Sequence, residues 1–263
     1  MDAYDEREQL IIDMGAYACK AQGDIFRDYK DDGSVLTATD TYINERVARG
    51  IAQLFPEADI VTEESLQPFS GEAPVTFILD PIDGTDVYSQ GLPGWCISLG
   101  ILNENRTCVG AMVYAPRWGL SSEEGLFLRQ DPGKDLLLNG KPFKPRLTHT
   151  KLEQLAMASH APRHISIKKF DGKIRCYGSN ILHMISPLIH PHIQGAISVP
   201  CFVWDIAGAH ALLELQGMVV QYGDGSPFIY TDKLLREREP FEGIVLSGTK
   251  EAVETMNTLF IPE

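Results

Sequence analysis

The sequence predicts a mixed α/β fold with an α+β N-terminal part and an α/β C-terminal part. Two observations carry this prediction. In the first half, helical stripes of apolar residues precede strand-like segments separated by turn residues, an order typical of helices packed on an antiparallel sheet. In the second half, short strand-like segments alternate with helical ones, as in α/β folds. We place the division so that the two parts span residues 1–146 and 147–263.

Two helices are predicted at the start of the chain. Residues 4–26 carry apolar side chains at helical spacing. A second stripe covers residues 43–54 and ends before Pro56, and Thr39 or Asp40 is the expected N-cap. Asp40 is therefore expected at the start of a helix.

Strands are predicted in both halves. In the first half they are expected at residues 60–61, 75–79, 96–102, 108–115 and 124–128. Turn residues separate the last three of these, which favours an antiparallel meander. In the second half we expect strands at residues 155–159, 174–177, 196–199 and 243–247, and helices at 179–187, 205–216 and 250–259. Residues 139–150 concentrate proline and basic side chains and are the predicted joint between the halves.

Composition and charge narrow the range of partners. The chain has 263 residues, 44% of them hydrophobic, which is enough for a substantial core. Its 23 Lys and Arg residues against 36 Asp and Glu residues give a net charge of −13, which disfavours a nucleic acid polymer as partner. The acidic N-terminal segment is unlike a secretory signal, and no apolar run approaches the ~18 residues of a membrane span. We expect a cytoplasmic protein that does not bind membranes.

Neither the cysteines nor the histidines predict a metal site. The 5 cysteines are odd in number and contain no CxxC pair, so neither a disulfide framework nor a zinc site is expected. His160 and His164 lie four residues apart, and His190 and His192 flank a proline, but no acidic partner follows at motif spacing. A hard-cation site elsewhere is the stronger candidate.

That candidate is the segment FILDPIDGTDVY, in which a buried strand ends in crowded carboxylates. Asp80 is expected at the end of the strand, and Asp83 follows around a tight turn stiffened by Pro81. Two buried carboxylates repel each other unless cations lie between them. Their oxygen ligands favour Mg²⁺, Mn²⁺ or Ca²⁺ over Zn²⁺. Gly84 and Thr85 would then present backbone N–H groups to a phosphate.

Two further acidic positions strengthen this interpretation. Glu63 and Glu64 follow a short predicted strand, and Asp205 is expected at the start of a helix. Taken alone, a pair of glutamates is typical of a solvated turn, and an aspartate at a helix start is typical of a helix cap. Their order and spacing along the chain carry the argument.

Together, the segments LTATD, TEES, DPIDGT, GSN and WDIAGAH resemble the inositol monophosphatase-like family of metal-dependent, lithium-sensitive phosphatases. The resemblance runs from about Asp32 to Gly217. It implies a layered α-β-α-β-α sandwich and a homodimer. It also implies a phosphatase that uses two or three Mg²⁺ ions, with Mn²⁺ as a substitute.

The resemblance assigns roles to residues of this chain. The implied metal ligands are Glu63, Asp80, Asp83, Asp205 and the backbone carbonyl of Ile82. The implied catalytic residues are Asp40, Thr85 and Glu64, with Thr85 hydrogen-bonded to Asp40 and helping to activate a metal-bound water. The implied substrate contacts are Asp83, Gly84, Thr85, Gly178, Ser179, Asn180 and Asp205.

The expected reaction is hydrolysis of a small phosphate monoester by direct attack of water. Inositol monophosphate is the nominal substrate because the metal motifs are spaced as in that branch. Members that prefer inositol phosphates usually carry a glutamate several residues before Trp-Asp, whereas Ser198 stands there in this chain. Members acting on 3′-phosphoadenosine phosphate often carry a tyrosine and an arginine just before Trp-Asp, and this chain has neither. Those nucleotides, histidinol phosphate and other sugar phosphates stay open.

A protein of another class is also open. A catalytically silent relative that binds metal or acts as a scaffold would share the fold. The retention of Asp40, Thr85 and all four metal carboxylates argues against it.

Overall fold

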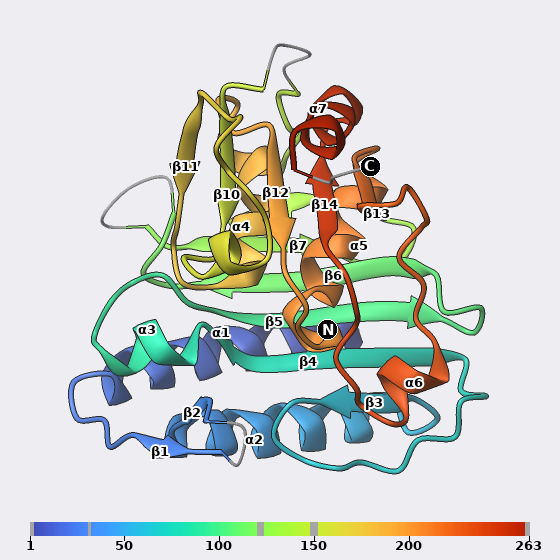
Figure 1. Ribbon diagram of the computed structural model, residues 1–263. Coiled ribbons are helices and arrows are strands. Elements are labelled where there is room, and N and C mark those ends of the chain that lie inside the picture. The colour runs from blue at the N-terminus through green and yellow to red at the C-terminus, as the bar shows by residue number, and fades with distance from the viewer. Residues whose placement is uncertain (1–2, 31–32, 120–123, 148–151, 261–263) are drawn as a thin grey trace.

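The chain forms two β-sheets separated and flanked by helices, as the computed structural model shows (Figure 1). The structure describes residues 3–30, 33–119, 124–147 and 152–260. The helices are α1 (Ala3–Ala21), α2 (Ala38–Leu54), α3 (Thr85–Ser89), α4 (Asn180–Ile189), α5 (Ala207–Leu215), α6 (Asp232–Leu235) and α7 (Lys250–Phe260), with 3-10 turns η1 (Ala161–Arg163) and η2 (Val203–Asp205).

The first sheet has seven strands in the order β3-β4-β5-β6-β7-β8-β9. Its strands are β3 (Asp59–Thr62), β4 (Val75–Asp83), β5 (Cys96–Asn103), β6 (Cys108–Ala115), β7 (Leu126–Gln130), β8 (Leu137–Leu138) and β9 (Lys141–Pro142). Strands β3 and β4 pair in parallel, and every later neighbour is antiparallel. The predicted meander is confirmed.

The second sheet has five strands in the order β11-β10-β12-β14-β13. Its strands are β10 (Gln154–Met157), β11 (Lys173–Arg175), β12 (Gly195–Ser198), β13 (Val219–Tyr222) and β14 (Val245–Gly248). Strand β10 pairs in parallel with β11 and β12, whereas β14 runs antiparallel to β12 and β13. A separate two-stranded ribbon joins β1 (Asp28–Tyr29) to β2 (Val35–Leu36).

These elements stack in five layers, which confirms the predicted α-β-α-β-α sandwich (Figure 1). Helices α1 and α2 pack on one face of the seven-stranded sheet, and α4 and α5 fill the space between the two sheets. Helix α7 covers the outer face of the five-stranded sheet. Each interface has its own apolar core, and the largest lies between the sheets.

Each sheet is built from one continuous stretch of the chain. Residues 59–142 supply the first sheet and residues 154–248 the second. The predicted joint at 139–150 includes β9, and its last residues, 148–150, lie outside the described residues. The division at residues 146 and 147 stays a prediction.

Two expected boundaries near the site are wrong. Thr37, and neither Thr39 nor Asp40, is the N-cap of α2, since its hydroxyl oxygen lies 3.4 Å from the Asp40 backbone nitrogen. Asp40 is the third helical residue, and its carboxylate accepts a hydrogen bond of 2.9 Å from the Thr37 N–H in a capping box. Strand β4 does not end at Leu79 or at Asp80, because it resumes pairing at Asp83 after a bulge.

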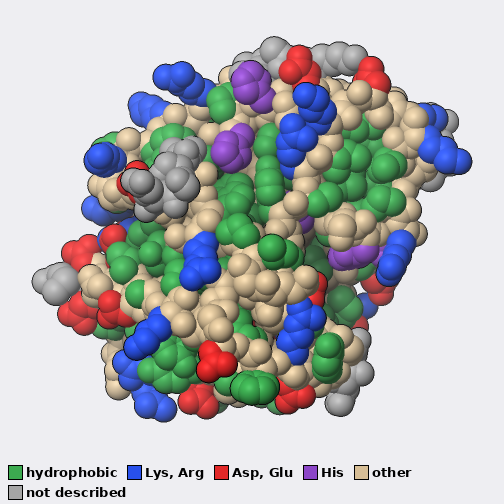
Figure 2. All heavy atoms as spheres, turned by 90° about the vertical axis from the view of Figure 1, so that its left-hand side faces the viewer, with side chains coloured by type: hydrophobic (Ala, Val, Ile, Leu, Met, Phe, Trp, Pro, Cys, Tyr) green, Lys and Arg blue, Asp and Glu red, His purple; other side chains and the backbone are tan. Residues whose placement is uncertain are grey.

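The surface mixes charges of both signs with apolar side chains. Figure 2 shows basic and acidic side chains interspersed over one face of the molecule. Among the described residues, no helix combines the length and the hydrophobicity that a membrane crossing requires.

Candidate active site

Three buried or half-buried aspartates converge where the two sheets meet. Asp80 and Asp83 lie on either side of the bulge in β4, and Asp205 ends the η2 turn that follows β12. Each offers a carboxylate oxygen, and the three oxygens lie within 4.8 Å of one another. The bulge is what turns Asp80 and Asp83 to the same side, since in a regular strand positions 80 and 83 would face opposite ways.

Asp80 fits a divalent cation best. Its side chain is 1% exposed, and neither carboxylate oxygen has a hydrogen-bond partner among the described residues. A buried charge without a partner is strongly unfavourable. The Asp80 carboxylate must therefore either take up a proton or bind a cation. An all-oxygen donor set suits Mg²⁺, Mn²⁺ or Ca²⁺. The residues present therefore fit the metal that the sequence predicts.

Asp83 is held by the start of α4. The Ser179 hydroxyl donates to one of its carboxylate oxygens, and the Ile181 N–H donates to the same oxygen at 2.6 Å. The Asn180 N–H donates to the other oxygen at 3.3 Å. These donors orient the carboxylate and stabilise its charged form.

Asp205 is fixed from its own turn. Its carboxylate accepts a hydrogen bond of 2.8 Å from the Phe202 N–H, and its backbone carbonyl accepts one of 2.9 Å from the Asn180 side-chain amide. Asn180 thus contacts the carboxylate of Asp83 through its backbone and the backbone of Asp205 through its side chain, so it ties strand β4 to the turn η2.

Close packing keeps α4 near Asp83. A Cβ atom added at Gly94 would lie 1.8 Å from the carbonyl oxygen of Tyr177. Only glycine allows the loop before β5 to approach the loop before α4 this closely. Gly84 has a φ of 95° and a prospective Cβ 2.9 Å from the Gly94 carbonyl oxygen, so the turn after Asp83 also needs glycine.

Glu63 and Glu64 follow β3 and share a cation from the ribbon. Lys30 Nζ lies 2.6 Å from Glu63 Oε1 and 2.6 Å from Glu64 Oε1. Arg238 donates to the backbone carbonyls of Thr62 at 2.6 Å and Glu63 at 2.7 Å, which holds the segment in place. Lys30 and Arg238 are neighbours of the site that the sequence does not predict. No motif marks either residue, and both reach the site from distant segments.

Asp40 and Thr85 form the expected hydrogen bond. Thr85 Oγ1 lies 2.9 Å from Asp40 Oδ1 and 2.9 Å from the backbone carbonyl oxygen of Ile82. Because a hydroxyl has one hydrogen, donation to Asp40 leaves the lone pairs of Thr85 able to accept a hydrogen bond from a water or substrate.

When no cation is present, the surroundings of the cluster make its carboxyl groups easier to protonate than they are in water. Burial raises the pKa of Asp40 and of Asp83 to about 6 each, against hydrogen bonds that act in the opposite direction. Burial, followed by repulsion from neighbouring carboxylates, raises the pKa of Asp80 and of Asp205 well above its usual value. Bound cations would reverse this preference, because positive charge stabilises the carboxylates.

Two adjoining cavities open at the cluster. One, of about 450 Å³, is lined by Glu63, Asp80, Ile82, Gly84, Thr85 and Asp205, among others. The other, of about 600 Å³, shares Glu63 and Asp205 and extends over Phe202, Trp204 and Arg238. A small phosphate ester could therefore place its phosphate against the carboxylates and its alcohol group in the second cavity.

The structure brings most of the predicted residues to one place and gives others a supporting position. Asp40, Glu63, Glu64, Asp80, Ile82, Asp83, Gly84, Thr85 and Asp205 lie in or beside this cluster. Gly178, Ser179 and Asn180 line neither cavity, although Ser179 and Asn180 bind Asp83. Their expected contact with substrate stays a prediction.

Known proteins resemble this chain in sequence and in architecture. The model of the inositol monophosphatase family matches residues 8–253. This chain belongs to the inositol monophosphatase family. An inositol monophosphatase 3 of Solanum lycopersicum is 31% identical over 148 residues, which are 52% of this chain and 53% of that protein. The chain thus aligns with about half of the tomato protein. The Nus factor SuhB of Pasteurella multocida is 26% identical over 220 residues, 78% of this chain and 79% of that protein.

Solved structures of the family share the fold. The Thermotoga maritima IMPase superposes with a TM-score of 0.80 at 20% identity, covering 98% of this chain and 96% of its own. An IMPase/NADP phosphatase solved with Mg²⁺ and phosphate superposes with a TM-score of 0.76 at 18% identity. The match covers 94% of this chain and 90% of that chain. The family resemblance inferred from the motifs is confirmed.

Proposed function

We propose that this chain is a Mg²⁺-dependent phosphomonoesterase that hydrolyses a small phosphate monoester, with inositol monophosphate as the nominal substrate. The observation that carries the proposal is Asp80, whose two buried carboxylate oxygens lack partners among the described residues and lie beside Asp83 and Asp205. An acidic cluster of this kind is unfavourable unless cations bind it. The family of the chain and its relative solved with Mg²⁺ and phosphate support the same reaction class.

Each residue has a distinct part in this proposal. Two or three ions would be held by Glu63, Asp80, Asp83, Asp205 and the carbonyl of Ile82, with Mn²⁺ as a substitute. Bound Mg²⁺ neutralises phosphoryl oxygens and lowers the pKa of water at the site. Asp40 orients the Thr85 hydroxyl, and that hydroxyl accepts a hydrogen bond from the attacking water. Glu64 shares Lys30 with Glu63 and so balances the charge beside the ligands.

The substrate contacts follow from the cavities. The phosphate would lie between the aspartates and the backbone of Gly84 and Thr85, which line the first cavity. Ser198, which stands where many inositol-specific relatives carry glutamate, is 1% exposed in β12. The alcohol group would therefore be selected elsewhere, by the surface that includes Phe202 and Trp204. Histidinol phosphate, 3′-phosphoadenosine phosphate and other sugar phosphates are the alternative substrates.

One panel assay tests the proposal and chooses among substrates. Phosphate release is measured from inositol phosphates, sugar phosphates, histidinol phosphate and 3′-phosphoadenosine phosphate over a series of Mg²⁺ concentrations, with and without lithium. We expect one preferred, Mg²⁺-dependent substrate. Asp83→Asn should lose turnover while remaining folded, and Asp135→Asn, an exposed aspartate that lines neither cavity, serves as its control. Full activity of Asp83→Asn would refute the assignment.

Isotope labelling tests direct attack by water. In oxygen-18 water, the first phosphate released should carry one solvent oxygen and the protein should carry none. A phosphoryl-enzyme that is hydrolysed at phosphorus gives the same labels, so the stereochemistry at phosphorus decides: inversion is expected for direct attack, and retention would show a covalent intermediate.

The alternative class is a silent relative with a binding role. Several relatives are named Nus factor SuhB, so members of this sequence group carry names other than that of a phosphatase. The hydrogen bond between Asp40 and Thr85 favours catalysis here, because a scaffold does not need it. Absence of turnover for every ester in the panel would favour the silent relative. Light scattering would test the homodimer that the family resemblance implies.

A further inference from the structure

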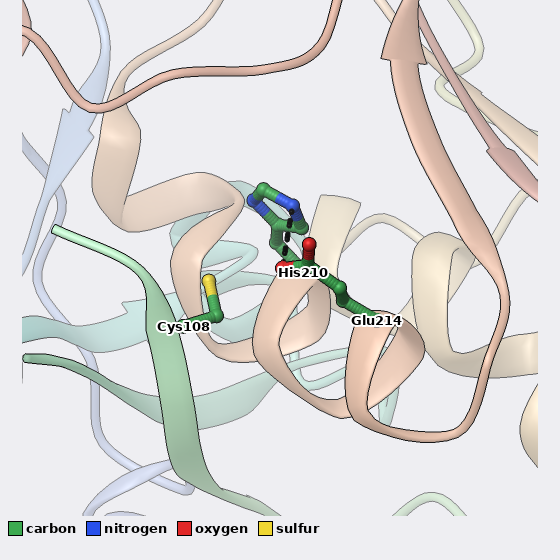
Figure 3. Close-up of side chains that lie close together, drawn as sticks. All are labelled: Cys108, His210 and Glu214. Carbon is green, nitrogen blue, oxygen red and sulfur yellow. Dashed lines mark ion pairs between the residues drawn. The ribbon is translucent and has the colours of Figure 1, made fainter. Parts of the chain in front are cut away.

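A second group of potential metal ligands lies between β6 and α5. Cys108 begins β6, and His210 and Glu214 lie one turn apart on α5 (Figure 3). One ligand atom from each lies within 4.8 Å of the other two. This group, which we call the Cys-His-Glu cluster, shares no residue with the aspartate cluster.

The spacing inside the cluster suits a tetrahedral ion. His210 Nε2 lies 3.5 Å from Glu214 Oε2, the contact dashed in Figure 3. Zinc bonds of ~2.0–2.3 Å in a tetrahedron place neighbouring donor atoms about 3.3–3.6 Å apart. The histidine and glutamate already have this separation, and because all three ligand atoms lie within 4.8 Å of one another, small rotations of the Glu214 and Cys108 side chains would bring in the sulfur.

Tyr230 orients the imidazole from behind. Its hydroxyl lies 3.0 Å from His210 Nδ1, and the Cys108 thiol donates to the same hydroxyl with a sulfur–oxygen distance of 3.8 Å. Metal-bound histidines usually have such a partner on the second ring nitrogen. If Nδ1–H donates to Tyr230, the lone pair of Nε2 faces Glu214, and the tyrosine hydrogen is free to stabilise a Cys108 thiolate.

Burial shifts the pKa of the histidine and of the cysteine in opposite directions. Burial lowers the pKa of His210 to about 4, so the imidazole is neutral and can coordinate at physiological pH. Burial raises the pKa of Cys108 to about 12, so without a metal it remains a thiol. The Glu214 side chain is 53% exposed, which gives an ion a route from solvent to a cluster whose other members are almost covered.

We propose that Cys108, His210 and Glu214 form a Zn²⁺ site that is separate from the Mg²⁺-binding aspartates. Thiolate and imidazole select zinc over magnesium, whereas the all-oxygen aspartate cluster has the opposite preference. Three protein ligands leave a fourth position for water. The ion would join β6 to α5 and, through Tyr230, to the segment before α6.

The first test uses the full chain with Co²⁺ and Zn²⁺ as probes in excess Mg²⁺. A cobalt ion bound by a thiolate shows charge-transfer absorption in the near ultraviolet that oxygen ligands do not give. We expect this absorption for the wild type, its loss on adding Zn²⁺, and its absence in Cys108→Ser. Cys201, whose thiol lies close to Asp205, provides the control: Cys201→Ser should keep the absorption.

Zinc affinity separates coordination from a packing role. Glu214→Gln keeps the size of an exposed side chain, so it should fold normally and bind Zn²⁺ at least about tenfold more weakly. Glu254→Gln, on α7, should bind Zn²⁺ as the wild type does. The Asp80→Asn variant should keep the thiolate absorption, because its change lies in the other cluster. No thiolate absorption in the wild type, or equal Zn²⁺ affinity of wild type and Glu214→Gln, would overturn the proposal.

Discussion

Neutralising Asp83 should change the stability of the metal-free protein in a way that depends on pH. Burial raises its pKa from 3.8 to about 6. The folded state therefore holds this proton more tightly than the unfolded chain does. The stability contributed by the group is complete below about pH 4 and is lost as the pH rises through about 6.

The size of the effect follows from the shift. From 3.8 to about 6 is about two pKa units, and each unit corresponds to about 1.4 kcal/mol. Between about pH 4 and pH 7, the unfolding free energy of the wild type should fall by about 3 kcal/mol relative to that of Asp83→Asn. The altered hydrogen bonds to Ser179 and Ile181 affect the variant equally at each pH, so they do not contribute to this slope.

Urea denaturation in the presence of a chelator measures the slope. Wild type and Asp83→Asn are unfolded at a series of pH values. The difference between their free energies of unfolding is plotted against pH. Asp135→Asn is the matched control, because its side chain is exposed and its charge stays hydrated. Added Mg²⁺ at 100 times its Kd should stabilise the wild type by about 2.7 kcal/mol and the variant far less. A difference that does not vary with pH would refute the reasoning.

Three further changes have expected outcomes. Thr85→Val removes the hydroxyl that lies 2.9 Å from Asp40 and should lower kcat by about 100-fold or more, while Thr85→Ser keeps most activity; equal loss in both would contradict the hydroxyl's role. Gly94→Ala forces a Cβ against a backbone carbonyl and should lower the unfolding free energy by at least about 1–3 kcal/mol in urea denaturation. Gly23→Ala, with no atom within 4 Å, is its control. Lys30→Gln removes a cation that competes with metal for Glu63 and Glu64. Thermal-shift titration should therefore show that the variant binds Mg²⁺ more tightly, by roughly tenfold or less. Weaker Mg²⁺ binding by the variant would contradict the competition.

Much of the fold could be predicted because its signals are local. The apolar spacing of α2 and the turn residues between β5, β6 and β7 are visible in short windows of sequence. Strand β13 is not predicted by the sequence. All four of its residues, Val219–Tyr222, are half-buried, and they show no clear apolar pattern. The α2 cap was misplaced because threonines and an aspartate stand close together, and only geometry shows that Thr37 begins the helix.

The sequence predicts those site residues that lie together in a motif. It does not predict those that folding brings together from distant segments. The carboxylates of DPIDGT lie together because they are neighbours in the chain, although the bulge between them was expected as a tight turn. Lys30 and Arg238 reach Glu63 from segments with no motif. The Cys-His-Glu cluster joins residues from β6 and α5, so cysteine spacing could not indicate it.

The position of Asp205 has a consequence for how the protein is made. Glu63, Asp80 and Asp83 all precede the second sheet in the chain, whereas Asp205 follows β12 within it. During synthesis from the N-terminus, the first sheet can form before the last carboxylate has left the ribosome. The set of carboxylates is therefore complete only when both sheets have docked. Metal affinity at this centre would then depend on the folding of both layers.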